Sequence, residues 1–362
     1  MIPVMNSMAV DVSVIGNHDL DFSAGHLRRL MGKTNFPWLF SNVKVGKPEE
    51  DSEEPQDGDE QPEGTLPHWI SEVQGLKIGV IGLIEKDWIK TIPSFPATWK
   101  YRSIVAMARK LSSTLRKGHG CDLVFALTHC RLPNDIDLAN DVGCCAQHSR
   151  NEPPTGDHID LILGGHDHTY YIGQGADKYD GEPFERPLGS EKDKDTMIIK
   201  SGTDFRDLSE AWLEVGPCST APEYQVIQKM SVRRIRTNPD GEYYSPLQTQ
   251  IEEIMQRIGQ ATSKPVVNTL TKWDVRSEKV RTEESAIGDF FADVFLHAYD
   301  DALRSQEQRG ELNPARDAGV RQVDIAFFCG GALRGDTVYG PGSISLGDIL
   351  EIMPFEDSVI VK

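Results

Sequence analysis

Three short apolar runs in this chain each lead into a turn that carries histidine, and this repeated placement limits the possible folds more than any other feature. The runs cover residues 12–15, 122–127 and 159–163, and they lead into GNHD, THC and GGHDHT. Short apolar runs of this kind are typical of buried parallel strands. Because parallel strands point their carboxyl ends toward one edge of an open α/β sheet, we expect the three turns to lie together. The sequence therefore predicts an α/β fold with a polar site at that edge.

The histidine turns supply a candidate metal site made of Asn17, His129, His166 and His168. His166 and His168 are two residues apart after a double glycine, so both side chains can project from one turn. Imidazole nitrogens suit Zn, Mn or Fe rather than Ca, and an amide oxygen broadens that range. Each turn taken alone also fits an ordinary polar loop with a capping residue. We interpret the remaining histidines of this half as loop residues: His26, His68, His119, His148 and His158.

His18 and Asp21 belong to the same stretch, GNHDLDF, and form a candidate catalytic pair. Asp21 would hold the imidazole of His18, which would then protonate a leaving alkoxide. Metal ions polarise phosphoryl oxygens and lower the pKa of a bound water, so this combination suits phosphoester hydrolysis. We find no convincing carboxylate to bridge two metals. Asp11 precedes the middle of its strand, and Asp167 would point between the two histidines.

The composition narrows the classes of partner. The chain has 362 residues and a net charge of −18, which argues against nucleic acid or an anionic membrane surface as a partner. No apolar run approaches the length of a membrane span. Part of the charge is an acidic tract at residues 48–67, for which we predict a solvated loop or disordered insertion, with a binding role as the alternative. The first residues show no signal peptide, so the cytoplasm is the default expectation and the compartment stays open.

The second half predicts a separate substrate-binding domain. A strong turn at 238–241 marks the boundary, and the apolar spacing at 246–260 predicts an amphipathic connecting helix. A strand at 324–328 would lead into a glycine turn, whose amides and Arg334 suit a phosphate or carboxylate. The candidates for substrate binding are Gly330, Gly331, Arg334, Phe355 as a flat surface for a base, and the weaker Arg281. The predicted domains are 1–240, a linker helix at 241–262, and 263–362.

These segments together resemble the metallophosphoesterase superfamily, specifically its 5′-nucleotidase family with an appended C-terminal domain. GNHDLDF is similar to the family's GNHEFDF, LTHC to its T/S-H turn, and GGHDHT to its GH-x-H turn. RTEESAIGDFFADV, CGGALRG and IMPFEDSV resemble segments of the family's second domain. The matches follow the family order from about residue 3 to residue 362.

The resemblance implies a four-layer α/β/β/α metal domain, N-terminally incomplete, followed by a smaller α+β domain. It also implies two divalent metals such as Zn or Mn, and a small-molecule nucleotide as substrate. The implied roles are metal ligands at Asn17, His129, His166 and His168, a catalytic dyad of His18 and Asp21, phosphate binding by Arg334 and Arg281, and base stacking by Phe355.

The chain also departs from the family pattern. The family's D-x-H ligand pair and its bridging G-D aspartate would precede residue 1, and Cys329 stands where the family has asparagine. We therefore expect a member truncated at both ends. The leading hypothesis is a nucleotidase; one alternative is an inactive fragment or pseudoenzyme that binds at most one metal or a nucleotide. An acidic interaction protein is a third reading. Mononucleotides, cyclic nucleotides and nucleotide sugars all remain open as substrates, as does the oligomeric state.

Overall fold

The structure is a computed structural model whose described residues form two compact units, Met1–Tyr244 and Ser245–Lys362. It describes residues 2–47, 52–56, 58–151, 153, 154, 156–184, 186–238, 241, 245–310 and 323–354. Each unit has a hydrophobic core of its own, and we describe each by itself. None of the helices within these ranges is long and apolar enough to cross a membrane.

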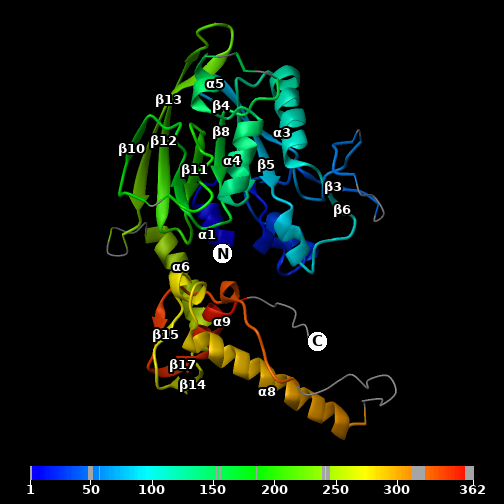
Figure 1. Ribbon diagram of the computed structural model, residues 1–362, viewed down its shortest axis with the longest axis vertical. Helices are drawn as coiled ribbons and strands as arrows, with labels where there is room; N and C mark the ends of the chain where they lie inside the picture. The colour runs from blue at the N-terminus through cyan, green and yellow to red at the C-terminus, as the bar shows by residue number, and fades with distance from the viewer. Residues whose placement is uncertain are drawn as a thin grey trace. The chain divides into compact units, whose positions relative to one another are not determined.

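A six-stranded sheet forms the centre of the first unit (Figure 1). Its strands, in spatial order, are β4 (Trp69–Val73), β5 (Leu76–Ile84), β7 (Leu123–His129), β8 (Leu161–Gly164), β11 (Ile198–Ser201) and β9 (Tyr170–Ile172). The four central strands are parallel, and the two edge strands run antiparallel to their neighbours. The carboxyl ends of β5, β7 and β8 therefore meet at one edge. The predicted α/β class is confirmed.

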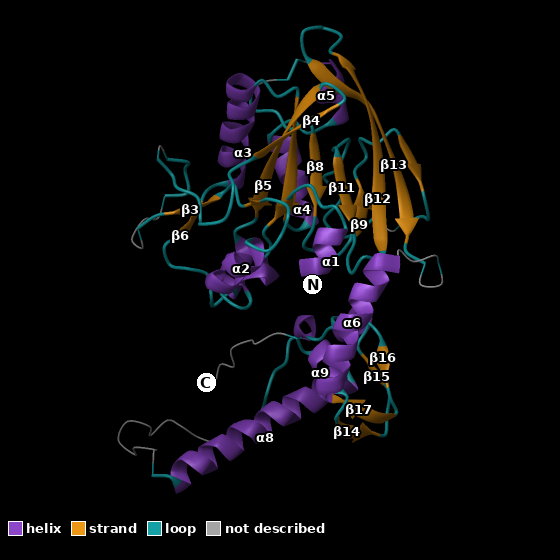
Figure 2. Ribbon diagram, turned by 180° about the vertical axis from the view of Figure 1, so that it is seen from behind, coloured by secondary structure: helices purple, strands orange, loops and turns teal. Residues whose placement is uncertain are grey.

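Helices cover one face of this sheet and a second sheet covers the other (Figures 1 and 2). The helices that pack on the strands are α3 (Ile104–Ser113) and α4 (Leu132–Asp141), and α5 (Ala146–Asn151) contacts the second sheet. That second sheet consists of β10 (Lys178–Asp180), β13 (Gln225–Arg236) and β12 (Asp207–Pro217). Side chains of β13 such as Ile227 and Met230 share one buried cluster with the central strands. β12 and β13 pair with each other antiparallel.

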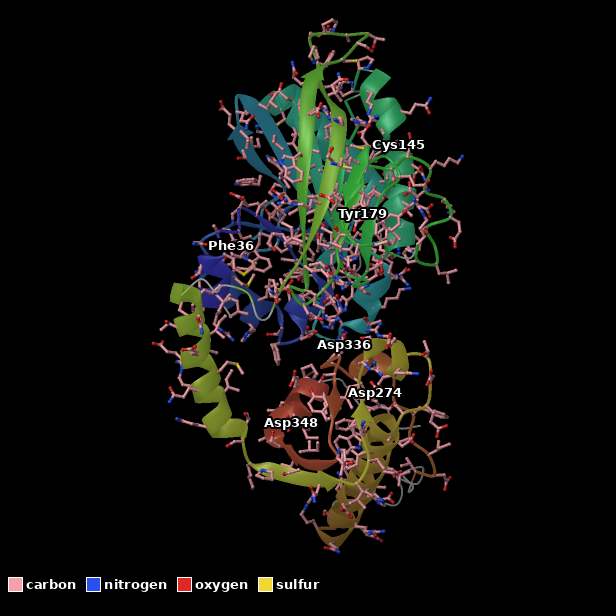
Figure 3. The ribbon with its side chains drawn as sticks, turned by 90° about the vertical axis from the view of Figure 1, so that its left-hand side faces the viewer. Phe36, Cys145, Tyr179, Asp274, Asp336 and Asp348 are labelled. Atoms are coloured by element: carbon pink, nitrogen blue, oxygen red, sulfur yellow. The ribbon has the colours of Figure 1, made fainter. Side chains whose placement is uncertain are left out.

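The N-terminal segment packs around a second cluster of the same unit. Its elements are α1 (Ile2–Ser7), β1 (Ser13–Val14), α2 (Ala24–Met31), β2 (Trp38–Leu39), β3 (Val43–Val45) and β6 (Trp99–Tyr101). Phe36, labelled in Figure 3, is buried here beside Trp38. The apolar stretch at 36–45 forms two separate strands, because β2 pairs with β1 and β3 pairs with β6. This pairing places β1 beside the central strands β5 and β7.

In its described part, the acidic tract is an irregular loop attached to the body of this unit, which corresponds to the loop alternative of the prediction. Arg102 is 1% exposed, and its guanidinium donates to both carboxylate oxygens of Asp59, at 2.6 and 3.1 Å. It also donates to the carbonyl of Ser52 at 2.7 Å. Glu60 pairs with Val45 in an isolated bridge. A buried arginine needs a paired anion, and an acidic loop that supplies one is held in place.

The second unit is smaller and mixes helices with short two-stranded pairs (Figures 1 and 3). Its helices are α6 (Ser245–Thr262), α7 (Ser277–Val280), α8 (Ala286–Gln308) and α9 (Leu346–Ile352). Its strands are β14 (Pro265–Thr269), β15 (Trp273–Asp274), β16 (Val338–Tyr339) and β17 (Gly342–Ser345). The helix predicted over 246–260 corresponds to α6. Asp348, labelled in Figure 3, forms a capping box with Ser345 at the start of α9.

The strand predicted at 324–328 is wrong. This segment is irregular, and its apolar side chains divide between solvent and core. Phe327 is 91% exposed, whereas Phe328 stacks on Phe291 and Phe295 of α8. The apolar run therefore reflects one side that packs on a helix, and within the described residues the segment has no strand partner.

Candidate functional site

The first histidine turn reaches the second because Gly16 has no side chain. A Cβ at Gly16 would lie only 2.6 Å from the imidazole of His129. This close approach lets Asn17, the next residue, place its Oδ1 2.8 Å from His129 Nε2. Asp19 stabilises the turn by accepting a hydrogen bond from the Gly16 amide at 2.8 Å. The short 3-10 helix Asn17–Leu20 thus holds the amide oxygen against the end of β7.

The second and third turns meet at neighbouring strand ends. His129 is the last residue of β7, and His166 follows the end of the adjacent strand β8. Nδ1 of His166 lies 3.1 Å from Nε2 of His129. The backbone φ angle is 85° at His166 and 60° at His168. Residues other than glycine rarely adopt this left-handed region. Such strain costs about 1–3 kcal/mol per residue and is concentrated at functional sites.

Glu85 is a member of this site that the sequence reasoning missed. It directly follows β5, the strand beside β7, and it is 4% exposed. Its Oε1 lies 3.6 Å from Nε2 of His166, while the other nitrogen of that ring faces His129. Arg131 and Asn134 donate to the Glu85 carboxylate as well. At 3.6 Å this is an electrostatic contact rather than a hydrogen bond, and it favours the ring orientation in which Nε2 faces the carboxylate.

Burial keeps the two facing imidazoles uncharged. Desolvation, followed by the neighbouring His166, lowers the pKa of His129 to about 3. The pKa of His166 is also lowered by burial, although Glu85 and Asp167 act in the opposite direction. Both rings are therefore neutral at pH 7, and the neutral imidazole is the form that binds a metal.

The three donor atoms fit a divalent cation. Two ligand atoms held at about 2.1 Å from one ion lie roughly 3.0–3.4 Å apart, close to the distances around His129 Nε2. That nitrogen carries either one proton or one lone pair, so it cannot satisfy both neighbours by ordinary hydrogen bonds. Within the described ranges, no group of three or more His, Cys, Asp or Glu side chains could hold a metal, and the third donor here is the Asn17 amide. Two imidazoles and an amide oxygen suit Zn, Mn or Fe.

The remaining predicted residues of this half surround those donors. Nδ1 of His18 lies 3.0 Å from Oδ2 of Asp21, and the His18 side chain is 45% exposed. His168 is exposed in the same turn as His166, and His18 and His168 both contribute to the lowered pKa of His129. The expectation that Asp167 points between the histidines is wrong: its Oδ2 accepts a hydrogen bond from the Leu132 amide at 2.6 Å.

The predicted substrate residues of the second unit lie around a tight backbone contact. A Cβ at Gly330 would lie 1.9 Å from the carbonyl oxygen of Val280, so only glycine fits there. This contact brings the glycine turn beside Arg281, which is exposed at the end of α7. Gly331 continues the 3-10 turn Gly330–Ala332, and the Arg334 amide donates to the Ile352 carbonyl at 2.7 Å. Phe355 lies outside the described residues.

The sequence has relatives among nucleotide phosphoesterases. Residues 257–362 match the family described as 5′-nucleotidase, C-terminal domain. The trifunctional nucleotide phosphoesterase protein YfkN of Bacillus subtilis is 24% identical over 99% of this chain and 22% of its own length. A 5′-nucleotidase of Vibrio parahaemolyticus is 30% identical over 45% of this chain and 27% of its own length. The chain thus spans about a quarter of the length of these two relatives.

Solved structures give the same fold. The 5′-nucleotidase precursor of Thermus thermophilus superposes with a TM-score of 0.65 over 97% of this chain and 59% of the other, at 18% sequence identity. At that identity the likeness supports the fold alone. The sequence relatives and the matched C-terminal domain carry the assignment to a family.

Proposed function

Because this chain belongs to the 5′-nucleotidase family of the metallophosphoesterase superfamily, we propose that it hydrolyses phosphate esters of nucleotides with divalent metal ions bound at the Asn17–His129–His166 site. The substrate would be a small nucleotide or a related nucleotide ester. The proposal extends to a dinuclear site, to which His168 would contribute a ligand for the second cation. The names of the relatives favour a hydrolase over an inactive chain.

One observation carries the proposal. Atoms from two other turns, Asn17 Oδ1 and His166 Nδ1, lie 2.8 and 3.1 Å from His129 Nε2, beside a hydrogen-bonded His18–Asp21 pair. Cations held there would polarise the phosphoryl oxygen and lower the pKa of a bound water. If the three histidine turns had only a structural role, each buried polar atom would ordinarily have one hydrogen-bond partner, and two atoms would not need to approach the same nitrogen.

The chain's own residues would perform the remaining steps. His18 is exposed enough to reach a substrate, and Asp21 holds its Nδ1, so Nε2 is the nitrogen proposed to act on the substrate. Protonated, that Nε2 would donate to the leaving oxygen as the ester bond breaks. Glu85 would keep the His166 ring in its ligand orientation.

The second unit would bind the nucleotide. Arg334 and Arg281 are the proposed phosphate partners, beside the amides of Gly330 and Gly331. A guanidinium binds phosphate through two parallel hydrogen bonds, which orients it as well as holding it. Phe355 would stack on the base.

Metal-dependent hydrolysis tests this function. The full chain is stripped with a chelator, reloaded with Mn²⁺ or Zn²⁺, and assayed for product release: inorganic phosphate from AMP, and a nucleoside monophosphate from a cyclic nucleotide or a nucleotide sugar. We expect release from at least one substrate, lost in EDTA and restored by metal, with the metal content measured by elemental analysis. Absence of release from all three substrates at full metal loading would overturn the proposal.

A matched pair of histidine variants locates the site. His129→Ala should lose bound metal and activity together. His119→Ala removes an exposed imidazole at the opposite end of β7 and should preserve both. Equal losses in the two variants would place the metal elsewhere.

A further inference from the structure

Lys200 is a buried cation in the middle of the first unit. It follows the apolar residues Ile198 and Ile199 on β11, and it is 1% exposed. Lysine is almost never fully buried without partners, because removing an ammonium from water is costly. Its Nζ donates to the carbonyl of Cys130 at 2.8 Å and to Oδ2 of Asp135 at 2.7 Å, and it forms an ion pair with Oδ1 of Asp167 at 3.1 Å.

Two of these partners belong to the histidine turns. Cys130 directly follows His129, and Asp167 lies between His166 and His168. One ammonium group therefore joins the backbone at the end of β7 to the side chain in the turn after β8. Asp167 strengthens the link, because its second oxygen accepts the Leu132 amide just beyond β7.

We propose that Lys200 is a positioning residue that sets the distance between the His129 and His166 turns and so assembles the ligand set. This role rests on the proposed metal site, but the contacts of Lys200 that define it are formed by the protein itself. Asp135, from α4, supplies a second carboxylate that fixes the ammonium in place. The His166 turn has a strained backbone, so it needs an external tether to keep one conformation.

The first test is Lys200→Met in the full chain, measured in two ways. In metal-free protein, the ring signals of His129 and His166 in NMR spectra should shift or broaden. Titration with Mn²⁺ should show affinity reduced about 10–100-fold, as for other residues that orient metal ligands. Unchanged ring signals with an affinity within twofold of the wild type, in a folded variant, would overturn the role of Lys200.

A second variant covers the case in which Lys200→Met does not fold. Asp167→Asn removes only the ion pair to the turn, and Lys200 keeps Asp135 as a counter-charge. We expect perturbed His166 ring signals and an affinity loss of about tenfold. Normal ring signals in this variant would count against the tether.

Lys192→Met is the matched control. It makes the same substitution at a lysine that is 70% exposed and paired with Asp137 on the surface. It should leave the ring signals and the affinity unchanged, and an effect as large as that of Lys200→Met would contradict a specific role. If the wild type binds no Mn²⁺, the proposed function fails at its metal site, whereas the ring signals still decide the role of Lys200.

Discussion

Gly16 shows how a single residue controls the contact between two strand ends. Replacement by alanine places a methyl group 2.6 Å from the His129 ring, a separation that requires atoms to move. We expect Gly16→Ala to destabilise the chain by about 1–3 kcal/mol, as overpacking does, and to weaken metal binding. Chemical denaturation and metal titration measure the two effects.

Gly25→Ala is the matched control for this substitution. Gly25 lies in α2, where a Cβ would meet its nearest atom only at 3.9 Å. Alanine in a helix is favoured over glycine by up to about 1 kcal/mol, so this variant should be neutral or slightly more stable. If Gly16→Ala changes the unfolding free energy no more than Gly25→Ala does, close packing against His129 is not the reason that position 16 requires glycine.

His18→Ala tests the proposed proton donor. Because His18 is proposed as the proton donor and Asn17, His129 and His166 as the ligands, its removal should leave the metal content intact and lower kcat by about 10²–10⁴-fold. Asp21→Asn should have a smaller effect in the same direction, since Asn can still hold the ring. Loss of metal with His18→Ala would assign that residue to binding instead.

Residue types at the site were predictable to different degrees. The histidines stand out because they follow apolar runs, but Glu85 follows an equally apolar run at 76–84 and was overlooked. Its signal is position rather than residue type: a charged side chain directly after a parallel strand lies at the same edge as the histidine turns. Lys200 inside an apolar strand is a second such signal.

At the scale of elements, the acidic tract depends on a buried ion pair. Arg102→Met would leave the Asp59 carboxylate, whose side chain is 9% exposed, without its partner. We expect a loss of about 3 kcal/mol in unfolding free energy and faster proteolysis within the tract. Lys86→Met removes an exposed ion pair to Glu53 and should cost less than about 1 kcal/mol. Equal losses would show that burial of the pair does not matter.

Low pH should weaken the Arg102–Asp59 ion pair and so detach the acidic tract from the first unit. Burial favours a raised pKa for Asp59, but hydrogen bonds from Arg102 and Gln56 outweigh it, so the pKa lies below its usual value. A depressed carboxyl pKa stabilises the fold above the unfolded value of about 3.9, and that stability is lost as pH falls through the folded value. Proteolysis of the tract should therefore accelerate below about pH 4, and Arg102→Met should lack this acid dependence. A tract equally resistant at pH 3 and pH 7 would contradict the link.

Helices and strands differed in how well the sequence predicted them. A helical stripe is a local pattern, and the helix predicted over 246–260 was found as α6. A strand needs a partner from elsewhere in the chain. The apolar run at 36–45 divides between two partners, and the run at 324–328 packs on α8 instead.

At the scale of the molecule, two separate cores should unfold separately. Ile287 is fully buried in the core of the second unit, so Ile287→Ala should cost about 2–5 kcal/mol there. In calorimetry of the full chain we expect two transitions, of which this variant lowers one. Added Mn²⁺ should raise the other, because a ligand stabilises the unit that binds it. Both transitions shifting together would show that the units unfold as one.

The sequence by itself determined the α/β class and the strand ends on which the histidines lie, because apolar runs and the residues after them are local patterns. Only the tertiary structure decided which of these residues touch. Gly16 lets Asn17 approach His129, Glu85 orients His166, and Lys200 ties two turns together. These contacts join segments up to about a hundred residues apart in the chain. Their geometry follows from strand order and close packing, which no local pattern encodes.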